Sequence, residues 1–513
     1  YMDILQNLAA GIAHLASPEV WLFIILGVAV GIVFGAIPGL TATTAIAMFT
    51  PLTFALSRYP AFGFLLGIYC GGYYAGSIPA ILLKTPGAPG NAATCVDGYP
   101  MREQGLAGKA LSLSVTSSMI GGIFSALVLL FFAPLIGKMG YLFGAPEYFA
   151  IAMMGMTCLA GVSGKDLCKG IASGLLGLCM AMIGQDAITG MTRFTFGSVQ
   201  MISGISLIPG LIGLFAVTEV LNKAEEIGRE KKGTITDFKF YPPKLADYIH
   251  IKWILFKSCV IGTVIGAIPG TGPTISAWMA YNEAKRSSKH PELYGKGSPE
   301  GVIACESSNN AVTGGAMIPL TTLGIPGDSV TAILLGALMI HGMTPGVTFV
   351  TNYADMLYFF FIVLIIANLF MWAFGLLGSK LFPYILSVPT QILMPFVIVM
   401  CICGVYAAAS TYYNLFLIVV LGAVGFLLIK AGFSMAPMVL GFVLGNIIEN
   451  NFQRALIGSN MDPLCFFSSP LSIGIWVAAI VLTTWMLVKN KQSNAMDAKL
   501  NSAKGADTSA EKD

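Results

Sequence analysis

Apolar runs long enough to cross a lipid bilayer constrain this chain more than any other feature. Four of them occupy residues 20–37, 356–378, 413–429 and 473–488. A helix needs about 20 mainly apolar residues to cross roughly 30 Å of hydrocarbon. Only 10% of the residues are charged, against about a quarter in soluble domains. Since backbone groups in hydrocarbon must be paired within the segment, runs of this length predict helices. We therefore expect an all-α polytopic membrane protein.

One short motif, GAIPG, interrupts these apolar runs twice, at 35–39 and at 266–270. Proline removes a backbone donor and crowds the preceding turn, and glycine adds conformational freedom. The first helix should therefore stop near Ile37 and restart with a threonine cap taken from Thr41, Thr43 or Thr44. Around Pro269 the same device is repeated by Gly270, Thr271, Gly272 and Thr274.

A second pair of segments indicates an internal duplication. GSIPAILLKTPG at 76–87 aligns with AMIPLTTLGIPG at 316–327, so that Pro79 matches Pro319 and Pro86 matches Pro326. Two spaced matches of this kind are typical of a duplicated unit. The predicted organisation is an N-terminal segment 1–19, a first transmembrane repeat 20–221, a charged cytoplasmic linker 222–252, a second transmembrane repeat 253–470, a final transmembrane helix 471–488 and a disordered cytoplasmic tail 489–513.

The distribution of Lys and Arg favours repeats of inverted topology. Short cytoplasmic loops carry an excess of these residues, and both the linker and 285–296 are rich in them. The intervening segment 253–284 should then enter and leave on the cytoplasmic side as a helical hairpin. Its counterpart 20–56 is preceded by nineteen residues without Lys or Arg. We expect the N-terminus outside, and Lys489 and Lys491 inside.

Broken helices inside a membrane can form an ion site. A restarted helix presents free N–H groups and a positive dipole end to an anion, and inverted-repeat transporters place their sites at paired breaks. The predicted substrate contacts are Thr41, Thr43, Thr44, Ser77, Thr271, Thr274, Asn309 and Asn310. The predicted coupling-ion ligands are carbonyls around Ile37, Pro79, Ile268 and Pro319. The alternative interpretation of each break is a proline kink that only shapes helix packing. Because the breaks are duplicated, we favour an ion site.

Ionisable groups at membrane depth are costly and mark pathways or pairs. Lys84, Glu306 and Asp328 are candidate charged contributors. Lys84 would either attract an anion or extend to the cytoplasmic interface. The amides of Asn309 and Asn310 suit ligand binding and interhelical hydrogen bonding equally well. Asp186 and Arg193 are expected to form a structural pair. The ten cysteines lack paired C-x-x-C spacing, so we expect no disulfide and no metal other than sodium.

Several motifs together resemble one membrane-protein family. GIVFGAIPGLTATTAIAM, GGYYAGSIPAILLKTPGAPGNAAT, TRFTFGSVQMISGISLIPG and GAIPGTGPTISAWM, followed by CESSNNAVTGGAMIPLTTLGIPGDS, resemble the large membrane subunit of the tripartite tricarboxylate transporters over most of 20–350. The resemblance implies a secondary transporter of the bacterial inner membrane that imports a small organic anion, a tricarboxylate or dicarboxylate such as citrate. It also implies two partners, a small membrane subunit and a periplasmic solute-binding protein, a sodium or proton gradient, and an elevator-like movement. Lys84 departs from the family pattern, in which a neutral polar residue precedes T-P-G.

Other function classes fit the sequence less well. An ion or anion channel would also use broken helices, but two matched sites in one chain suit alternating access. An enzyme is not expected, because H-E-x-x-H and G-x-S-x-G motifs are absent, and a P-loop is absent too. We expect no cofactor beyond the coupling ion and no nucleic-acid partner. The expected contacts are with the lipid bilayer, and a homo-oligomer is compatible with the sequence.

Overall fold

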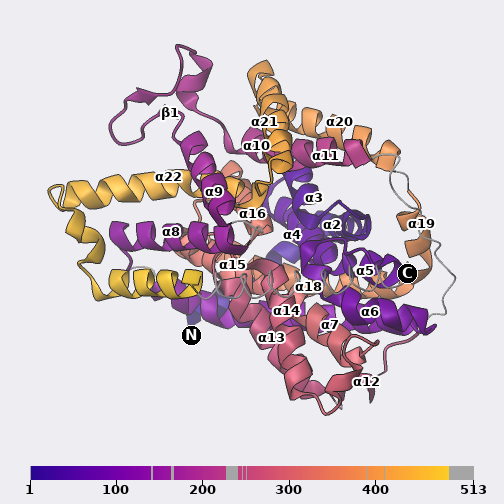
Figure 1. Cartoon of the computed structure of the whole chain (residues 1–513). Helices are drawn as coiled ribbons and strands as arrows, with labels where there is room; N and C mark the ends of the chain where they lie inside the picture. The colour runs from indigo at the N-terminus through magenta and orange to yellow at the C-terminus, as the bar shows by residue number, and fades with distance from the viewer. Residues whose placement is uncertain are drawn as a thin grey trace, which may run out of the picture.

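The computed structural model describes residues 2–139, 142–162, 167–226, 241–244, 246–249, 251–388, 390–409 and 411–484 (Figure 1). The helices before the linker are α1 (Met2–Ala13), α2 (Pro18–Ala36), α3 (Ala42–Phe49), α4 (Arg58–Ala75), α5 (Ser77–Leu83), α6 (Thr94–Glu103), α7 (Ala107–Met139), α8 (Ala145–Val162), α9 (Leu167–Ala181), α10 (Leu207–Leu211) and α11 (Thr218–Glu226). Strands β1 (Gly184–Gln185) and β2 (Thr192–Arg193) pair antiparallel, with Gly184 opposite Arg193. The turn η3 (Pro89–Asn91) precedes α6, and the π-helical segment η6 (Ile212–Val217) joins α10 to α11.

The helices of the second part are α12 (Ala246–Ile249), α13 (Lys252–Ala267), α14 (Gly272–Ser287), α15 (Pro299–Leu323), α16 (Ser329–Ile340), α17 (Val347–Asn352), α18 (Ala354–Leu377), α19 (Phe382–Leu386), α20 (Thr390–Ala409), α21 (Tyr412–Lys430) and α22 (Met435–Gly458). One more apolar helix spans Pro470–Thr484. Most of the predicted linker and all of the tail lie outside the described residues.

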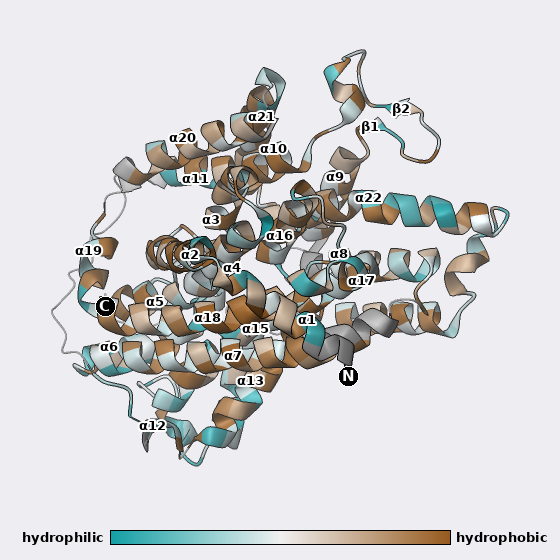
Figure 2. Cartoon of the chain, turned by 180° about the vertical axis from the view of Figure 1, so that it is seen from behind, coloured by the Kyte–Doolittle hydropathy of each residue, from teal (hydrophilic) through white to brown (hydrophobic). Residues whose placement is uncertain are grey.

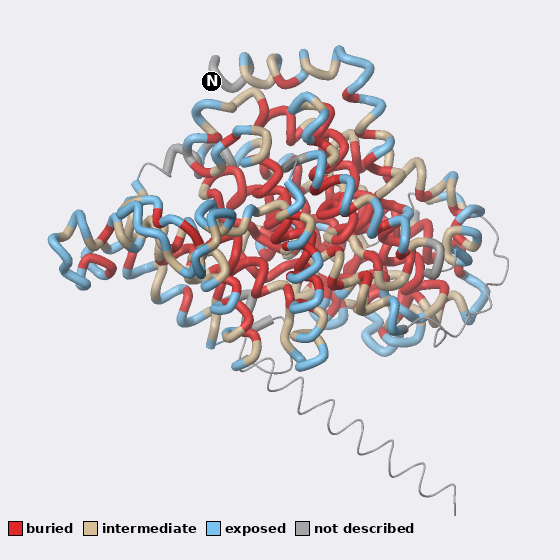
Figure 3. Tube along the Cα trace, turned by 90° about the horizontal axis from the view of Figure 1, so that it is seen from above, coloured by how far each residue is buried: buried red, intermediate tan, exposed pale blue. Residues whose placement is uncertain are grey.

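The helices confirm the predicted fold class of an all-α polytopic membrane protein. Six of them in the described part of the chain are long and apolar enough to cross a membrane. The predicted runs 20–37, 356–378 and 413–429 fall on α2, α18 and α21. The run 473–488 begins within Pro470–Thr484 and then leaves the described residues. Apolar residues dominate most of the ribbon in Figure 2, and the buried residues form a continuous centre in Figure 3.

Two helix pairs, α2 with α4 and α13 with α15, make matching close contacts through glycine. A Cβ atom on Gly31 would lie 2.5 Å from the Ile68 carbonyl oxygen, and one on Gly262 would lie 2.3 Å from that of Ser308. One turn later, a Cβ on Gly35 would meet the Gly72 oxygen at 2.5 Å, and one on Gly266 would meet the Val312 oxygen at 2.8 Å. Only glycine permits such approach of two backbones. The same contacts therefore recur in the two halves.

The first pair of breaks lies where the sequence predicts it. Helix α2 ends at Ala36 and α3 begins after Thr41, which is the N-cap. Helix α13 ends at Ala267 and α14 begins at Gly272. Gly39 and Gly270 have φ angles of 86° and 80°, which L side chains rarely adopt. Glycine is thus required at both turns.

The second pair of breaks lies one turn beyond the I-P dipeptides. Pro79 and Pro319 lie within α5 and α15, and the chain leaves the helix at Lys84 and Gly324, which have φ angles of 60° and 72°. The same bond closes both helix ends: Thr85 N–H donates to the Pro79 oxygen at 3.3 Å, and Ile325 N–H donates to the Pro319 oxygen at 3.2 Å. The breaks therefore centre on Pro86–Gly87 and Pro326–Gly327.

Two ion-pair groups tie distant segments together. Lys257, near the start of α13, pairs with Glu283, near the end of α14, at 3.3 Å, so these helices run antiparallel side by side. Arg193 lies 3.7 Å from Asp186, as predicted, and 2.5 Å from Glu449 of α22.

Candidate functional site

The starts of α3 and α16, which follow breaks in opposite halves, meet in space. The hydroxyl oxygens of Thr43 and Ser329 are 3.2 Å apart, and both side chains are half-buried. The Thr41 hydroxyl accepts from Thr44 N–H at 3.3 Å and lies 3.2 Å from the Thr44 hydroxyl. Two helix N-termini and a group of hydroxyls thus converge on one place.

The start of α14 meets the loop after α5 in a corresponding crosswise arrangement. A Cβ on Gly90 would lie 2.9 Å from Pro273 Cβ and 2.6 Å from Asn309 Oδ1. Within the second half, Gly270 N–H donates to the Gly327 oxygen at 2.9 Å. Each broken segment of one half therefore packs against a broken segment of the other.

A cation lies beside the first break. A Cβ on Gly39 would be 1.8 Å from Lys223 Cε and 2.4 Å from its Nζ. Lys223 belongs to the last turn of α11, at the edge of the linker. Its ammonium group adds positive charge close to the start of α3, where helix dipoles already favour anions.

Asp328 caps α16 and is buried, with 2% of its surface exposed. Its Oδ1 accepts from Thr331 N–H at 2.7 Å. Its Oδ2 accepts from the hydroxyls of Tyr69 at 2.8 Å and Tyr73 at 2.5 Å, both on α4. A buried carboxylate needs such donors to offset its lost hydration, so Asp328 fixes the start of α16 against α4.

Glu306, in the middle of α15, is fully buried. Its Oε1 accepts from Thr94 at 2.5 Å and from Asn91 Nδ2 at 3.2 Å, and its Oε2 accepts from Ser118 at 3.1 Å. All three donors are neutral and come from the first half. Among the described residues no ion pair of Glu306 is found.

The backbone of Tyr73 joins these two carboxylate sites. Its carbonyl oxygen accepts from Asn309 Nδ2 at 3.0 Å and from Asn91 Nδ2 at 3.3 Å, while its hydroxyl donates to Asp328. Residues of α4, α15, η3 and α16 therefore form one connected polar network between the breaks.

The predicted substrate contacts do not all gather at this place. Asn310 points elsewhere: its Nδ2 lies 3.2 Å from Met371 Sδ of α18, and its Oδ1 has no hydrogen-bond partner among the residues that the structure describes. Ser77 pairs with Ser114 of α7 at 2.7 Å. Thr271 donates to the Ile265 and Ile268 oxygens at the end of α13. Thr274 is half-buried in the first turn of α14.

The carbonyls predicted to bind the coupling ion each accept a local hydrogen bond. Leu40 N–H donates to the Ile37 oxygen at 3.1 Å, and the Thr271 hydroxyl donates to the Ile268 oxygen at 2.9 Å. The Pro79 and Pro319 oxygens close the ends of their helices, as described above. Three of these oxygens accept a second bond as well: Thr271 N–H donates to the Ile268 oxygen, Lys84 N–H to that of Pro79 and Gly324 N–H to that of Pro319. Since a carbonyl oxygen has two lone pairs, these three would have to give up a donor to bind an ion.

Lys84 lies away from the convergence. Its side chain is exposed, and its Nζ is 5.3 Å from the centre of the Tyr99 ring on α6. This contact is favourable, since an aromatic ring attracts a cation over its face.

The Asp186 cluster lies outside the membrane-spanning helices. Hydrogen bonds from the backbone of Ile188 and the amide of Gln453 hold the pKa of Asp186 well below its usual range. A hydrogen bond to Glu449 raises the pKa of Arg193. The pair is structural in geometry, joining the β1–β2 hairpin to α22.

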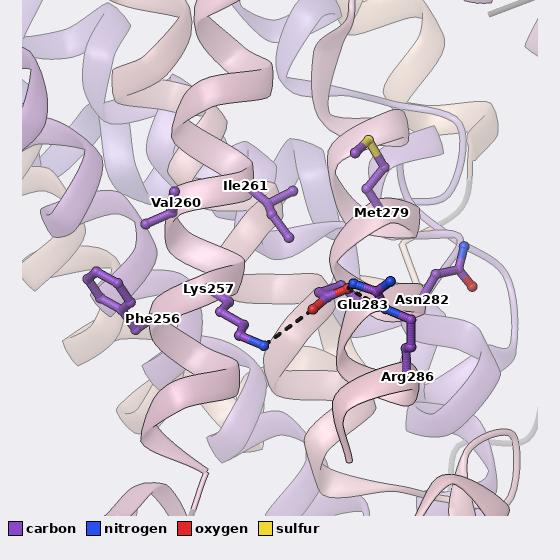
Figure 4. Close-up of a pocket in the computed structure, with 8 residues that line it drawn as sticks. All are labelled: Phe256, Lys257, Val260, Ile261, Met279, Asn282, Glu283 and Arg286. Carbon is purple, nitrogen blue, oxygen red and sulfur yellow. Dashed lines mark hydrogen bonds and ion pairs between the residues drawn. The ribbon is translucent and has the colours of Figure 1, made fainter. Parts of the chain in front are cut away.

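A groove of about 590 Å³ opens between α13 and α14, but it is distant in sequence from the breaks of these helices. Figure 4 shows the ion pair between Lys257 and Glu283 that joins the two helices, and Arg286 pairs with the same carboxylate. Because its charged residues are paired with one another, we interpret the groove as the side of the hairpin formed by α13 and α14. It is not part of the place where α3 and α16 meet.

Sequence reasoning missed several residues of the polar network and of the place where α3 and α16 meet. They are Tyr69, Tyr73, Asn91, Thr94, Ser118, Lys223 and Ser329. One signal was available for two of them. Asn91 and Thr94 lie in the GNAAT stretch directly after the second break, and small polar residues beside a break are candidates for its site.

Comparison with known proteins gives a family and two relatives. Residues 21–440 match the family model described as the tripartite tricarboxylate transporter TctA family. The chain is 33% identical over 496 residues to an uncharacterized 52.8 kDa protein in the TAR-I ttuC' 3' region of Agrobacterium vitis, covering 96% of this chain and 98% of that protein. It is 32% identical over 234 residues to an uncharacterized protein in the TAR-II ttuC' 3' region of the same organism, covering 45% of this chain and 97% of that one. No solved structure matches.

Proposed function

Because the chain belongs to the tripartite tricarboxylate transporter TctA family, we propose that it carries out secondary active import of a small organic anion. The substrate class is a tricarboxylate or dicarboxylate such as citrate. The site of import is the bacterial inner membrane, and a sodium or proton gradient drives it.

The meeting of Thr43 and Ser329 is the observation that carries this proposal. Both residues lie in the first turns of helices restarted inside the membrane, so free N–H groups and two positive dipole ends point to one place. Lys223 adds an ammonium group beside the first break. An anion with more than one carboxylate suits donors that approach from two halves of the chain.

Predicted substrate contacts follow from this placement. Thr41, Thr43 and Thr44 would contact the anion from α3, and Thr274 with the start of α14 would contact it from the other side. Asn309 lies beside that second start. Thr271, Ser77 and Asn310 would act indirectly, because each already has a partner elsewhere.

Inverted repeats and an elevator-like movement belong to the same proposal. The matched glycine contacts and the matched helix ends support a duplicated unit, and the distribution of Lys and Arg supports inversion. Two similar units packed crosswise around one site can exchange their arrangement to open it to either side.

The proposed partners are a small membrane subunit and a periplasmic solute-binding protein that delivers the anion. Uptake of labelled carboxylates, from citrate to simple dicarboxylates and aromatic acids, tests the proposal in cells that contain all three components. Saturable accumulation that needs sodium, or that a protonophore abolishes, is the expected result. If no acid accumulates while a current passes across a bilayer, the chain is a channel and the proposal is wrong.

A further inference from the structure

The burial of Glu306 poses a physical problem that its hydrogen bonds solve only in part. Moving an ionised carboxylate out of water costs far more than a few neutral hydrogen bonds return, unless a cation compensates it. Three neutral groups, Thr94, Asn91 and Ser118, contact its oxygens. Within the described residues none of the basic side chains forms an ion pair with it.

We propose that Glu306 binds the univalent cation, Na⁺ or H⁺, whose gradient drives import. This inference rests on the proposed function and deepens it, since it places the coupling cation at a side-chain carboxylate and not at the loop carbonyls. A cation at this position supplies the charge that the surrounding helices lack.

The groups around Glu306 can accommodate either cation. The Thr94 and Ser118 hydroxyls donate to the carboxylate now, and each also has lone pairs with which to accept. Asn91 is 1% exposed, and in the described part of the chain its Oδ1 has no hydrogen-bond partner. A proton on Glu306 would need only rotation of a hydroxyl. Na⁺ would find hydroxyl and carboxylate oxygens, and the Asn91 amide, whose Nδ2 faces Glu306, would add its oxygen by turning over.

The position of Glu306 links the cation to the anion site. Asn91 bridges Glu306 and the Tyr73 carbonyl, which also holds Asn309. The side chain of Tyr73 in turn holds Asp328 at the start of α16. Neutralising Glu306 weakens its pull on Asn91, and this change reaches the breaks of both halves through hydrogen bonds. Such a difference between cation-bound and cation-free states is what coupling requires.

The titratable groups that interact electrostatically with Glu306 are ones that stay neutral at physiological pH. Those with an electrostatic interaction with it are Cys305 on its own helix, Tyr74 of α4 and Cys95 of α6. Thiols and phenols are ordinarily neutral at physiological pH. On α7 and η3 the facing groups are the neutral Ser118 and Asn91. Beyond them, Lys84 and Asp97 interact with Cys95 and Cys305, respectively.

The test compares the wild-type three-component transporter with its Glu306→Gln variant in proteoliposomes. Glutamine keeps the shape of the side chain but carries no charge, and thus resembles the cation-bound state. Gradient-driven accumulation should fall by about tenfold or more, within the usual range of coupling between two sites. Counterflow exchange of labelled for unlabelled anion should continue, but it should lose its dependence on Na⁺ and pH.

Two imposed gradients identify the cation. A Na⁺ gradient at constant pH drives wild-type uptake if the cation is Na⁺, and a pH gradient without Na⁺ drives it if the cation is H⁺. Wild-type liposomes that neither accumulate nor exchange any carboxylate would contradict the proposed function. Wild-type liposomes that accumulate an acid, beside a Glu306→Gln variant with unchanged cation dependence, would contradict only the role of Glu306.

Further variants keep the test decisive if Glu306→Gln does not fold. Thr94→Val and Ser118→Ala retain the carboxylate and each remove one ligand, so the cation concentration for half-maximal uptake should rise several-fold. The matched control is Asp97→Asn, a second buried carboxylate whose Oδ1 accepts backbone N–H groups of Gly295, Gly297 and Ser298. It should lower stability and leave the cation dependence as in the wild type. An unchanged half-maximal cation concentration in both Thr94→Val and Ser118→Ala would overturn the proposal.

Discussion

In the first half α5 ends at Lys84 and the following loop runs through Ala88, whereas in the second half α15 ends at Gly324 and the loop runs through Asp328. These residues are 240 positions apart and share a backbone path, with the same left-handed helix end and the same closing hydrogen bond. Their side chains differ. Glu306 likewise has Leu66 as its counterpart in the first half.

The difference teaches that the backbone of the breaks is common to both halves, while Asp328 and Glu306, the two carboxylates of the polar network, belong to one. Asp328 and Glu306 both come from the second half and both accept hydrogen bonds from the first half, on α4, η3, α6 and α7. The backbone geometry common to both halves can present helix starts to an anion. A carboxylate found in the second half alone can bind the cation.

The largest effect is expected from the matched glycines that follow the prolines of the second pair of breaks. A Cβ on Gly87 would lie 2.4 Å from the Gly35 oxygen, and one on Gly327 would lie 2.6 Å from the Gly266 oxygen. Gly87→Ala and Gly327→Ala should each lower the free energy of unfolding by about 3 kcal/mol or prevent folding, because backbone must move. Thermal unfolding in detergent measures this. Gly458→Ala is the control, since its Cβ would meet no described residue within 4 Å. Tolerance of one change but not the other would break the equivalence of the halves.

Removal of the Asp328 carboxylate, which has no counterpart in the first half, should have the next largest effect. Asp328→Ala leaves the hydroxyls of Tyr69 and Tyr73 and the Thr331 N–H without their acceptor, at an expected cost of about 2–4 kcal/mol. Thr41→Ala, which removes the cap of α3 in the other half, should cost about 1 kcal/mol. Denaturation of the two purified variants gives the comparison, and equal losses would show that Asp328 is only a cap.

Exchanging the helix-end residues should have opposite effects in the two halves. Lys84→Gly removes a side chain from a left-handed position and should raise the free energy of unfolding by about 1 kcal/mol. Loss of the contact between Lys84 and the Tyr99 ring offsets part of this gain. Gly324→Ala introduces a side chain at the matched position and should lower stability by about 1 kcal/mol. Melting temperatures of both variants in one detergent decide the matter; a shift of the same sign in both would contradict the shared geometry.

The smallest effect concerns a contact outside the breaks. The pKa of Asp186 is lowered in the folded state by the Ile188 backbone and Gln453. Because the folded pKa lies below the unfolded one, its stabilisation is complete above about pH 4 and is lost as the pH falls further. The melting temperature of the wild type should therefore drop more between pH 5 and pH 3 than that of Asp186→Asn. Equal falls in melting temperature for the wild type and Asp186→Asn would show that Asp186 does not stabilise the folded state.

The breaks could be predicted from sequence because proline and glycine act locally. Helix ends at Ala36 and Ala267 and the cap at Thr41 follow from the residues themselves. The donors to Asp328 could not, since Tyr69 and Tyr73 lie more than 250 positions away and only the tertiary fold brings the N-cap of α16 to them.

Helix geometry explains the separation of Asn309 and Asn310. Consecutive residues on a helix differ in direction by about 100°, so both amides could not face one site. Asn309 faces the breaks and Asn310 faces α18. A helical projection of α15 would have separated these two residues in advance.

The most direct test of the account asks whether helix starts from the two halves bind one anion. Counterflow in proteoliposomes that contain the complete transporter gives the apparent affinity for the transported carboxylate, in the wild type and in Thr43→Ala/Ser329→Ala. Loss of two hydrogen bonds to a charged group should weaken that affinity by about tenfold or more, with the melting temperature of the anion-free protein unchanged. Thr484→Ala, a distant hydroxyl bonded to its own helix, should have no effect. An unaltered affinity in the double variant would contradict the proposed anion site.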